Sequence, residues 1–338
     1  SRHLIGIDIG TSAVKVVEFG GMGAKKLRAI GLELLPQDAV VDGMIRSQND
    51  VVGVTSDLLR RLKIITTGRR VAISLSGSSV VIKRVSVARA NDADFAQQVY
   101  YEAEQHFQHD IAELYFDYYE ARQIVDQQGK TPVVLVGAKR EMVEQHISVV
   151  RDLGMRVGVV DCDVFAAANM FEFNYGAPQT LVALVNVGAA VTQVSLVAGG
   201  QYLFTRDVPI GGEEYSRQVM EALGVDRENA EALKVSASNG NDRAPEALQK
   251  VMSDMNEQLV NEIRSSIDFF FQGGEAPGNL SGLSHVFLAG GGARTLGLDA
   301  ALSAQMQLPV QIVNPFLRLE VNPRHFEIDY VLMQGHLY

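Results

Sequence analysis

The hydrophobic pattern of the chain opens with two apolar runs separated by a short turn of small residues. Apolar positions fill residues 4–9, the turn occupies residues 10–12, and apolar positions return at residues 13–19. Two such runs joined by a tight turn predict a β-hairpin. A third apolar run at residues 26–35, ended by a proline-containing break, predicts a third strand beside the hairpin.

The turn of this hairpin carries candidate ligand-binding groups. Gly10 permits a positive φ and lets a ligand approach the backbone closely. The Thr11 and Ser12 hydroxyls, with successive amide groups, could hold phosphate oxygens. Asp8 is anionic and cannot bind phosphate directly, but it could hold a hydrated Mg²⁺ beside it. An ordinary hairpin turn without a ligand explains the same residues equally well, because short glycine motifs recur by chance.

The same plan returns in the second half of the chain. An apolar run at residues 180–187 meets a small-residue turn beginning at Gly188, a second run follows at 191–197, and a third lies at 201–206. The sequences differ, but the order of elements repeats. This internal repeat predicts a duplicated α/β domain with a candidate phosphate-binding loop in each half.

The residues between the two copies alternate between helical and strand patterns. Predicted helices lie at 47–64, capped by Ser47 or Asn49, and at 92–107, 141–153 and 164–173. Predicted strands lie at 70–75, 80–87, 115–119, 133–136 and 156–160, the last of them as a buried strand. The β-α-β-β-α order over residues 80–155 is compact enough to form an inserted subdomain. Its five tyrosines, at 100, 101, 115, 118 and 119, are expected mainly in the core and in cross-strand pairs, with an exposed patch for a protein partner as the alternative.

Helices dominate the part that follows the second copy. The pattern predicts helices at 213–223, closed by Gly224, at 227–234 and at 245–272, with a solvated loop at 237–242. A strand at 285–289 then runs into Gly290, Gly291 and Gly292, a helix starts near 296, and a last strand lies at 309–313. The expected division is 1–79, 80–155 (inserted) and 156–179 in the first lobe. The second lobe takes 180–206, 207–284 (a subdomain) and 285–338, whose end returns to the first lobe.

Composition narrows the class of protein. Of the 338 residues, 47% are hydrophobic and 21% are charged, which is typical of a soluble globular chain rather than a disordered one. The formal net charge is −10 and no basic block occurs, which argues against a nucleic-acid partner. The single cysteine, Cys162, excludes an internal disulfide and fits a reducing compartment. No apolar run approaches the roughly 20 residues that span a bilayer, and no signal peptide is visible.

Three small-residue turns that follow strands, at Gly6–Ser12, Val185–Thr192 and Leu288–Ala293, resemble the two phosphate motifs and the adenosine motif of the actin-like ATPase superfamily. This superfamily includes actin, DnaK-type chaperones, sugar kinases and FtsA. The resemblance implies an α/β, actin-like (ribonuclease H-like) duplicated two-lobe fold that binds ATP and Mg²⁺ between its lobes. It implies nucleotide contacts at Gly10, Thr11, Ser12, Lys15, Gly188, Ala189, Gly212, Gly290, Gly291 and Gly292. It also implies a Mg²⁺ held through water by Asp8 and Asn186.

A short helix carries a further part of the resemblance. Asn229–Lys234 is similar to the superfamily's Ala-Glu-x-x-Lys helix, which implies that Glu231 and Lys234 contact the adenine and ribose. A solvated i,i+3 salt bridge, worth about 0.2–0.5 kcal/mol, is the alternative for this pair.

Within the superfamily the chain most resembles the PilM family of type IV pilus assembly proteins. The resemblance rests on Ile7–Gly10 with Val14–Glu18, on the insertion over residues 80–155, and on Ile210–Glu214. It implies a cytoplasmic ATP-binding scaffold, recruited to the inner membrane through a partner. The implied partners are the N-terminal cytoplasmic tail of the membrane protein PilN, which would dock on the first lobe and the inserted subdomain, and other inner-membrane pilus assembly proteins. Self-association is a further expectation.

The candidate chemistry favours nucleotide binding over turnover. The second loop has Asn186 where the superfamily usually has aspartate, and Ala189 where actin has another acid; neither side chain accepts a proton. Asp163 remains the candidate for orienting the attacking water, and an N-cap role in the following helix is its alternative. Gln193 is a weaker candidate for orienting that water. Lys15 could reach a phosphate or simply face solvent. We therefore expect at most a slow ATPase. A small-molecule kinase and an FtsA-like cell-division protein are the alternative functions, and the latter would need a C-terminal amphipathic helix.

The histidines and the cysteine show no spacing typical of a metal site. His106, His109 and His146 lack the spacing of a zinc site. Cys162 is flanked by apolar residues and is expected to be a buried structural thiol.

Overall fold

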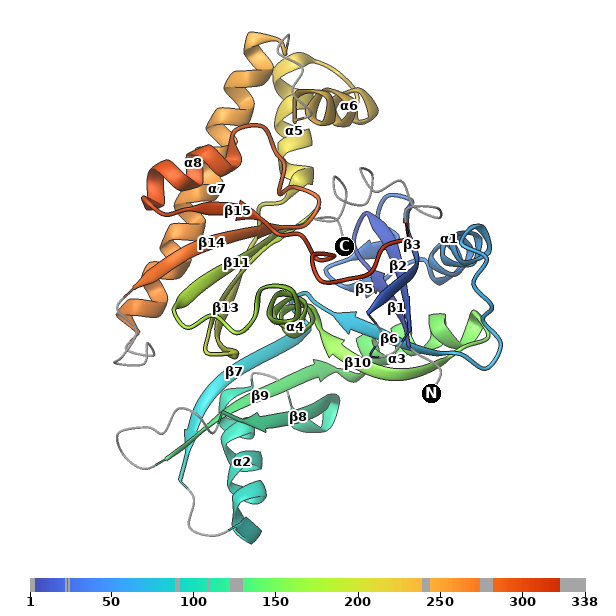
Figure 1. Ribbon diagram of the computed structural model, residues 1–338, viewed down its shortest axis with the longest axis vertical. Coiled ribbons are helices and arrows are strands. Elements are labelled where there is room, and N and C mark those ends of the chain that lie inside the picture. Colours follow the sequence, from blue (N-terminus) through green and yellow to red (C-terminus); the bar gives the residue numbers. More distant parts are fainter. Residues whose placement is uncertain are drawn as a thin grey trace. The chain divides into compact units, whose positions relative to one another are not determined.

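The computed structural model of the chain describes residues 4–21, 23, 25–88, 92–107, 110–121, 130–238, 244–273 and 282–322. The chain forms two compact units. The first unit comprises residues 1–166 and 319–321, and the second comprises 167–318 and 322–338. Each unit contains a mixed five-stranded sheet with helices packed against it (Figure 1).

The sheet of the first unit has the strand order β10-β6-β1-β2-β3. Its strands are β1 (Ile5–Ile9), β2 (Ala13–Gly20), β3 (Lys26–Leu34), β6 (Arg70–Leu75) and β10 (Arg156–Cys162). The predicted hairpin is present: β1 pairs antiparallel with β2, and β2 pairs antiparallel with β3. On its other side β1 pairs in parallel with β6, and β6 with β10. The parallel strands β1, β6 and β10 therefore end at the same edge of the sheet.

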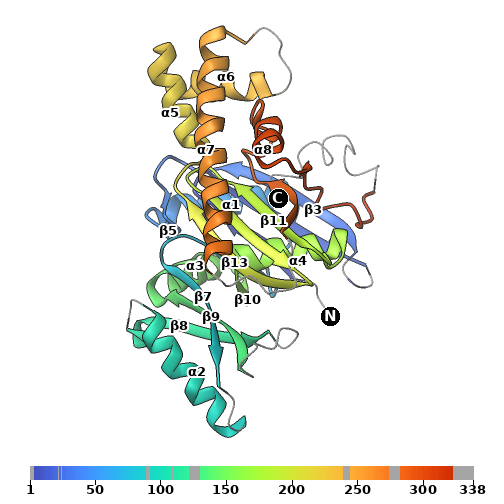
Figure 2. The same cartoon turned by 90° about the vertical axis from the view of Figure 1, so that its left-hand side faces the viewer.

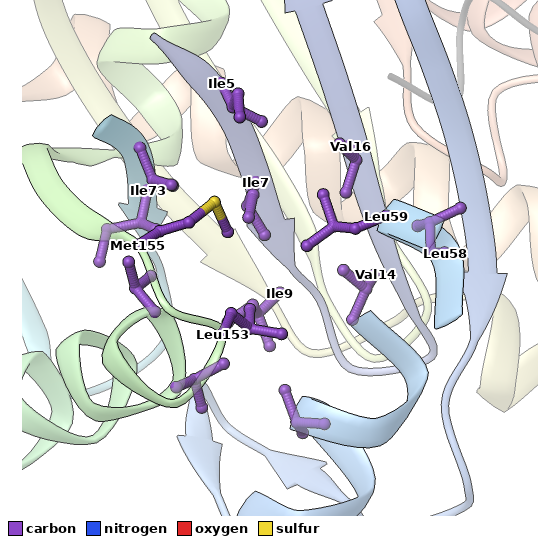
Figure 3. Packing of buried hydrophobic residues seen from close by; sticks show 14 of the residues in the cluster. Ile5, Ile7, Ile9, Val14, Val16, Leu58, Leu59, Ile73, Leu153 and Met155 are labelled. Carbon is purple, nitrogen blue, oxygen red and sulfur yellow. The ribbon is translucent and has the colours of Figure 1, made fainter. Parts of the chain in front are cut away.

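The core of the first unit explains why these strands form. Alternate side chains of β1 and β2 are buried on one sheet face, where α1 (Gln48–Arg61) and α3 (Arg140–Asp152) cover them. Figure 3 shows the β1 and β2 side chains meeting Leu58 and Leu59 of α1. Ser47 stands at the predicted N-cap position of α1, but its hydroxyl donates to Asp50 Oδ2 and accepts no hydrogen bond from a backbone N–H of the helix, so the side-chain cap is not formed.

A separate three-stranded sheet, in the order β7-β9-β8, belongs to the first unit. It consists of β7 (Val80–Val87), β8 (Leu114–Glu120) and β9 (Thr131–Lys139), with antiparallel pairing throughout. α2 (Asp92–His106) packs on one face, where Phe95, Val99 and Leu135 lie in one buried cluster, and the short 3₁₀ helix η2 (Ile111–Glu113) leads into β8. The order β7, α2, β8, β9, α3 follows the predicted β-α-β-β-α pattern; the turn expected at 127–129 lies outside the described residues.

Most of the tyrosines in this segment are exposed. Tyr118 packs against the buried cluster, whereas Tyr100 and Tyr101 on α2 and Tyr115 and Tyr119 on β8 have exposed side chains. The expectation of core tyrosines is therefore wrong for these four. Successive side chains of a strand point to opposite faces of the sheet, so Tyr118 on β8 meets the buried cluster while Tyr115 and Tyr119 lie on the other face.

The sheet of the second unit repeats the plan of the first, in the order β13-β12-β11-β14-β15. Its strands are β11 (Leu181–Val187), β12 (Thr192–Ala198), β13 (Gln201–Val208), β14 (Leu283–Ala289) and β15 (Val310–Ile312). β11, β12 and β13 pair antiparallel, and β11, β14 and β15 pair in parallel. The two sheets thus share one topology, as the internal repeat predicts. Two short strands of the first unit, β4 (Val40–Val41) and β5 (Met44–Ile45), form a small hairpin.

The helices of the second unit include α5 (Gly212–Leu223), α6 (Arg227–Ser238), α7 (Glu246–Gln272) and α8 (Leu298–Met306), and α4 (Asp163–Tyr175) joins the two units. α7 is the long helix of Figure 2 and packs against α5 and α8. Its buried stripe includes Met255, Leu259, Ile263, Ile267 and Phe270, as predicted, whereas Val251 is half-buried. Gly224 ends α5 in the left-handed conformation, with φ 64°, which confirms the predicted C-terminal glycine.

Two local predictions are wrong. α6 continues to Ser238 instead of ending near Lys234, because Ala237 is buried and the Ser238 hydroxyl accepts a hydrogen bond from Leu296 N. The predicted strand at 156–160 forms as β10, but it is not buried: it is the edge of its sheet, and Val159 and Val160 are 41% and 39% exposed.

A late segment of the chain completes the first sheet. Leu27 N donates to Glu320 O at 3.0 Å and Glu320 N donates to Lys25 O at 2.7 Å, so residue 320 lies beside the start of β3. The finer six-part division of the chain stays a prediction. Among the helices of the described ranges, none combines the length and the apolar character needed to cross a membrane.

The packing of α1 gives a stability prediction. Leu58 is fully buried against the β1–β2 hairpin, while Leu34 at the end of β3 is 69% exposed. Leu58→Ala should lower the free energy of unfolding of the first unit by about 2–5 kcal/mol, because it removes buried methyl groups and leaves a cavity. Leu34→Ala is the matched control and should change it by less than about 0.5 kcal/mol. Denaturant titrations that give equal shifts for both variants would contradict this packing.

Candidate functional site

The first candidate loop lies where β1 turns into β2. Gly10 N donates to Ala13 O at 3.0 Å and closes the turn. Gly10 does not use a positive φ, contrary to the possibility raised from the sequence. The close approach is the actual constraint, because a Cβ at Gly10 would lie 3.2 Å from Ala13 O and 3.7 Å from Lys15 Nζ.

Asp8 and Lys15 face each other across this hairpin. They are paired residues of β1 and β2, and Lys15 Nζ lies 2.6 Å from Asp8 Oδ2. The Lys15 side chain is 26% exposed, so the expectation of a solvent-facing lysine is wrong. Burial alone would lower the pKa of Lys15, but the charge and hydrogen bond of Asp8, with the charge of Asp163, raise it above its usual value. Lys15 is therefore a fixed cation beside the candidate phosphate turn.

Asp163 joins this pair from a different strand. It follows β10 directly, as the first residue of α4. Because Leu75 of β6 pairs with Cys162 of β10, Asp163 lies beside Ser76, and the Ser74 and Ser76 hydroxyls favour its ionised form. Burial and the negative charge of Asp8 raise the pKa of Asp163 to about 6, against the opposing effects of the two serines and Lys15. The carboxyl ends of β1, β6 and β10 thus bring Asp8, Lys15 and Asp163 together.

This cluster offers the oxygen donors that a hydrated Mg²⁺ uses. Asp8 is 38% exposed and can share its carboxylate with Lys15 and with a metal-bound water. Burial is the main cause of the raised pKa of Asp163, and repulsion from the Asp8 carboxylate adds to it; a divalent cation would relieve that repulsion. The residues present therefore fit a Mg²⁺ ion.

Two neighbouring groups have structural roles. Cys162 is buried, and burial with the charges of Asp161 and Asp163 raises the pKa of its thiol to about 12, as expected for an inert structural cysteine. His146 is buried in α3 with its Nδ1 2.9 Å from Met142 O, and burial lowers its pKa.

The second candidate loop has the same backbone geometry but a different chemistry. Gly188 N donates to Val191 O at 3.0 Å, and a Cβ at Gly188 would lie 2.8 Å from that oxygen. Asn186 and Gln193 are paired across the β11–β12 hairpin, as Asp8 and Lys15 are across the first. The ion pair of the first unit is therefore replaced by two neutral amides. Gln193 Nε2 donates to Asp207 Oδ1, away from Asn186, at 3.2 Å.

The start of α5 docks on this loop. Gly212 N donates to Gly188 O at 2.9 Å, and Glu213 N donates to Ala189 O at 2.8 Å. Gly211 permits the approach, because a Cβ there would lie 2.4 Å from Ala189 O. The predicted residues Gly188, Ala189 and Gly212 are thus brought together by main-chain hydrogen bonds.

The triple-glycine turn reaches the same loop. Gly290 has φ 85°, and a Cβ there would lie 2.3 Å from Asn186 Oδ1. Gly292 N donates to Val187 O at 2.9 Å, and a Cβ at Gly292 would lie 2.3 Å from Val187 Cγ1. Packing therefore requires glycine at the first and third positions. Gly291 stands between them.

Lys234 and Glu231 lie beside the start of α5. Lys234 Nζ donates to Gly212 O at 2.6 Å and to Glu231 Oε1 at 2.9 Å, and it also donates to Ser216 Oγ. Its side chain is only 13% exposed, and burial lowers its pKa despite Glu231. The i,i+3 salt bridge of the alternative is therefore present, but its lysine is not solvated, because Lys234 is anchored to the first turn of α5.

A buried polar network holds the segment that follows the triple-glycine turn. The Tyr215 hydroxyl donates to Asn256 Oδ1 at 2.9 Å, and Asn256 Nδ2 donates to Leu296 O at 2.8 Å. Tyr215 and Asn256 are buried on α5 and α7. Since Leu296 also bonds to Ser238 of α6, the three helices fix the segment that follows the glycines.

Sequence reasoning missed the serines and the asparagine of these networks. Ser74 and Ser76 alternate on a strand that ends at the site edge, which is a signal for side chains aimed at the next strand. Ser216 lies one helical turn after Gly212, and its hydroxyl donates to Gly212 O and to Glu231. Asn256 carried a weaker signal, as a polar residue within the buried stripe of α7.

Comparisons with known proteins agree with this architecture. The family model described as type IV pilus assembly protein PilM matches residues 6–332. The structure is similar to one described as the PilM-PilN type IV pilus biogenesis complex, with a TM-score of 0.85 and 23% identity over 100% of this chain and 96% of that chain.

Two more distant structures have the same fold. One is the ethanolamine utilization protein EutJ from Carboxydothermus hydrogenoformans, with a TM-score of 0.59 and 16% identity over 99% of this chain and 89% of that one. The other is MreB 5 of Spiroplasma citri bound to AMPPNP, with a TM-score of 0.57 and 12% identity over 99% and 95%. The chain therefore has the actin-like ATPase fold.

The raised pKa of Asp163 gives a pH-dependent prediction. An acid whose pKa rises from about 3.9 to about 6 on folding costs stability when it is ionised, and the cost disappears as the pH falls below both values. Asp163→Asn should therefore raise the melting temperature at pH 8. The gain should shrink as the pH falls through 6 and be nearly absent near pH 4. Thermal unfolding across this range measures it, and a gain independent of pH would contradict the raised pKa of the buried Asp163 carboxyl.

Proposed function

Because the chain belongs to the family of type IV pilus assembly protein PilM, we propose that it is a nucleotide-binding scaffold of pilus assembly that holds a membrane partner. The match over residues 6–332 carries this proposal, since it spans both units. Its two duplicated sheets each end in a turn built for close backbone approach, at Gly10 and Gly188. The actin-like ATPase fold implies nucleotide binding, and the solved MreB 5 structure is bound to AMPPNP.

The proposed nucleotide ligand is ATP with Mg²⁺, and each unit contributes binding groups. In the first unit, Gly10, Thr11, Ser12 and Lys15 would contact phosphate oxygens, and Asp8 would hold Mg²⁺ through water. In the second unit the proposed contacts are Gly188, Ala189, Gly212, Glu231, Lys234, Gly290, Gly291 and Gly292, with Asn186 toward Mg²⁺. The Lys15–Asp8 contact of 2.6 Å supports this assignment, because it keeps a cation at the turn without a ligand.

The chain's own residues favour slow turnover. Hydrolysis of a nucleotide needs a positioned water and a group that orients it or takes its proton. Asp163 is the proposed catalytic group, which would orient that water, and its pKa of about 6 leaves it mostly ionised at neutral pH. Asn186 and Ala189 supply no proton acceptor in the second loop. Mg²⁺, when bound, would supply charge stabilisation to the phosphates.

Lys234 and Glu231 would act differently in this scheme. Glu231 is 44% exposed and is the better placed of the two to meet a ribose hydroxyl. Lys234 is 13% exposed and already donates to Gly212 O, so its proposed part is to hold the first turn of α5 at the nucleotide.

The proposed partner is the N-terminal cytoplasmic tail of PilN, since the similar solved structure is described as a PilM–PilN complex. The docking surface would lie in the first unit and include its three-stranded sheet. Exposed Tyr119 supports this, because its ring meets Phe165 of α4 edge-on at 5.9 Å, two residues beyond Asp163. The protein would work in the cytoplasm and reach the inner membrane through this partner. ATP would tune partner binding by favouring one conformation.

Nucleotide binding is tested by two matched glycine variants. Gly290→Ala and Gly176→Ala carry the same backbone strain, with φ 85° and 84°, but only the Cβ at Gly290 meets Asn186. Gly290→Ala should weaken binding of MgATP by about tenfold or more, equal to about 1.4 kcal/mol, while Gly176→Ala stays near wild type. Calorimetric titration measures both. Wild-type turnover should fall below the 1–100 s⁻¹ typical of kinases, and equal losses in the two variants would contradict the site.

Partner binding is tested with a synthetic peptide of the PilN tail, with and without MgATP. We expect the wild-type protein to bind the peptide and not a scrambled one, and the affinity to change when MgATP is added. Tyr119→Ser should weaken peptide binding more than Tyr101→Ser, since Tyr101 lies on α2, across the sheet from Tyr119. No binding to either peptide by fluorescence anisotropy would contradict the proposed partner.

A further inference from the structure

The turn between β6 and β7, residues 76–79, is held by an exposed aspartate from a distant part of the chain. Ser78 N donates to Asp42 Oδ1 at 2.9 Å, and the Ser78 hydroxyl donates to Asp42 Oδ2. Asp42 lies in the turn between β4 and β5. One carboxylate thus receives two hydrogen bonds from one serine, which fixes both turns against each other.

The backbone at this contact is unusual. Asp42 has φ 49°, Gly43 has φ 75° and Gly77 has φ 94°. A Cβ at Gly43 would lie 2.3 Å from Ser76 O, and one at Gly77 would lie 2.6 Å from Asp42 O. A non-glycine residue at positive φ costs free energy and persists where its surroundings hold it, often near functional sites.

The turn that Asp42 holds begins beside Asp163. The pairing of Leu75 with Cys162 puts Ser76 beside Asp163, whose ionised form the Ser74 and Ser76 hydroxyls favour, and Ser76 immediately precedes Gly77. The far end of the turn is also tied down, because Lys139 N donates to Ser79 O at 3.0 Å. Asp42 therefore fixes the middle of the turn, beside Ser76.

We propose that Asp42 is a positioning residue of the Mg²⁺–nucleotide site: it holds the 76–78 turn so that the Ser76 hydroxyl meets the Asp163 carboxylate. Through that contact it sets the direction from which Asp163 reaches a metal-bound water. This rests on the proposed function, and it adds a residue that neither contacts the ligand nor lies on the site strands. Partners that orient a metal-site group in this way are typically worth 10–100-fold in metal affinity.

The test uses two variants of Asp42 and one control. Asp42→Ala removes both acceptors, whereas Asp42→Asn tolerates the positive φ and keeps an acceptor for Ser78 N. Asp38→Ala is the control, because Asp38 is also exposed and has φ 59° in the same segment. The readouts are hydrogen exchange of the Ser78 amide in the free protein, and ATP affinity with and without Mg²⁺.

Asp42→Ala should speed Ser78 amide exchange and weaken binding of MgATP by about tenfold, while metal-free ATP binds within about twofold of wild type. In Asp42→Asn, both the Ser78 amide exchange and the MgATP affinity should lie close to wild type. Asp38→Ala should change neither the exchange nor the affinity. Unchanged MgATP affinity in Asp42→Ala, with a wild type that binds, overturns the positioning role and leaves the proposed function standing.

Two further outcomes are informative. If Asp42→Ala fails to fold by circular dichroism, Ser78→Ala decides, because it removes the hydroxyl that donates to Asp42 Oδ2. A loss of affinity for MgATP alone supports the role of Asp42, and no loss, or an equal loss with and without Mg²⁺, overturns it. If the wild type binds no ATP at all, the proposed function fails and the site role of Asp42 fails with it. In that case, unchanged hydrogen exchange of the Ser78 amide in Asp42→Ala would also show that Asp42 does not hold the turn at residues 76–79.

Discussion

Close main-chain approach at the turn after the first strand of each sheet is the constraint on which the rest of the site depends. Gly10 and Gly188 close their turns with the same 3.0 Å hydrogen bond. In the second unit the turn also receives the start of α5 through Gly212 and the triple-glycine turn through Gly292. A side chain at Gly188, Gly211 or Gly292 would separate segments that now share hydrogen bonds, so glycine at these three positions is a condition of the fold as well as of any ligand contact.

The two halves use the same backbone for different electrostatics. At matching positions across the hairpin, the first unit has the ion pair of Asp8 and Lys15, and the second has Asn186 and Gln193. Replacing both charges by neutral amides leaves no unpaired charge behind. The first hairpin therefore carries charge, to which Asp163 adds a second acid, whereas the second hairpin carries neutral amides and the nearest ion pair described there, Lys234 with Glu231, lies on α6.

The periodicity of apolar residues predicts the strands, the long helices and the duplication, because these depend on local burial patterns. It does not predict whether a strand lies in the middle or at the edge of its sheet. Val159 and Val160 look like core residues in the sequence, but they are exposed because their strand, β10, has a neighbouring strand on one side only. Networks are also missed. The partners of Asp163 and Lys234 are serines and a carbonyl far away in the sequence, and nothing local in a serine shows which distant group it meets. The resemblance located the loops, and the structure supplied what holds them.

The hydrogen bonds between Glu320 and the start of β3 bear on how the chain folds during synthesis. A ribosome makes the strands of the first sheet early, but residue 320 emerges only after nearly all of the second unit has been made. Until then the first residues of β3 remain an open sheet edge, of the kind that invites pairing with other chains. This contact of the first unit thus closes only after nearly all of the second unit has been made, and a nascent chain has to protect that edge until then.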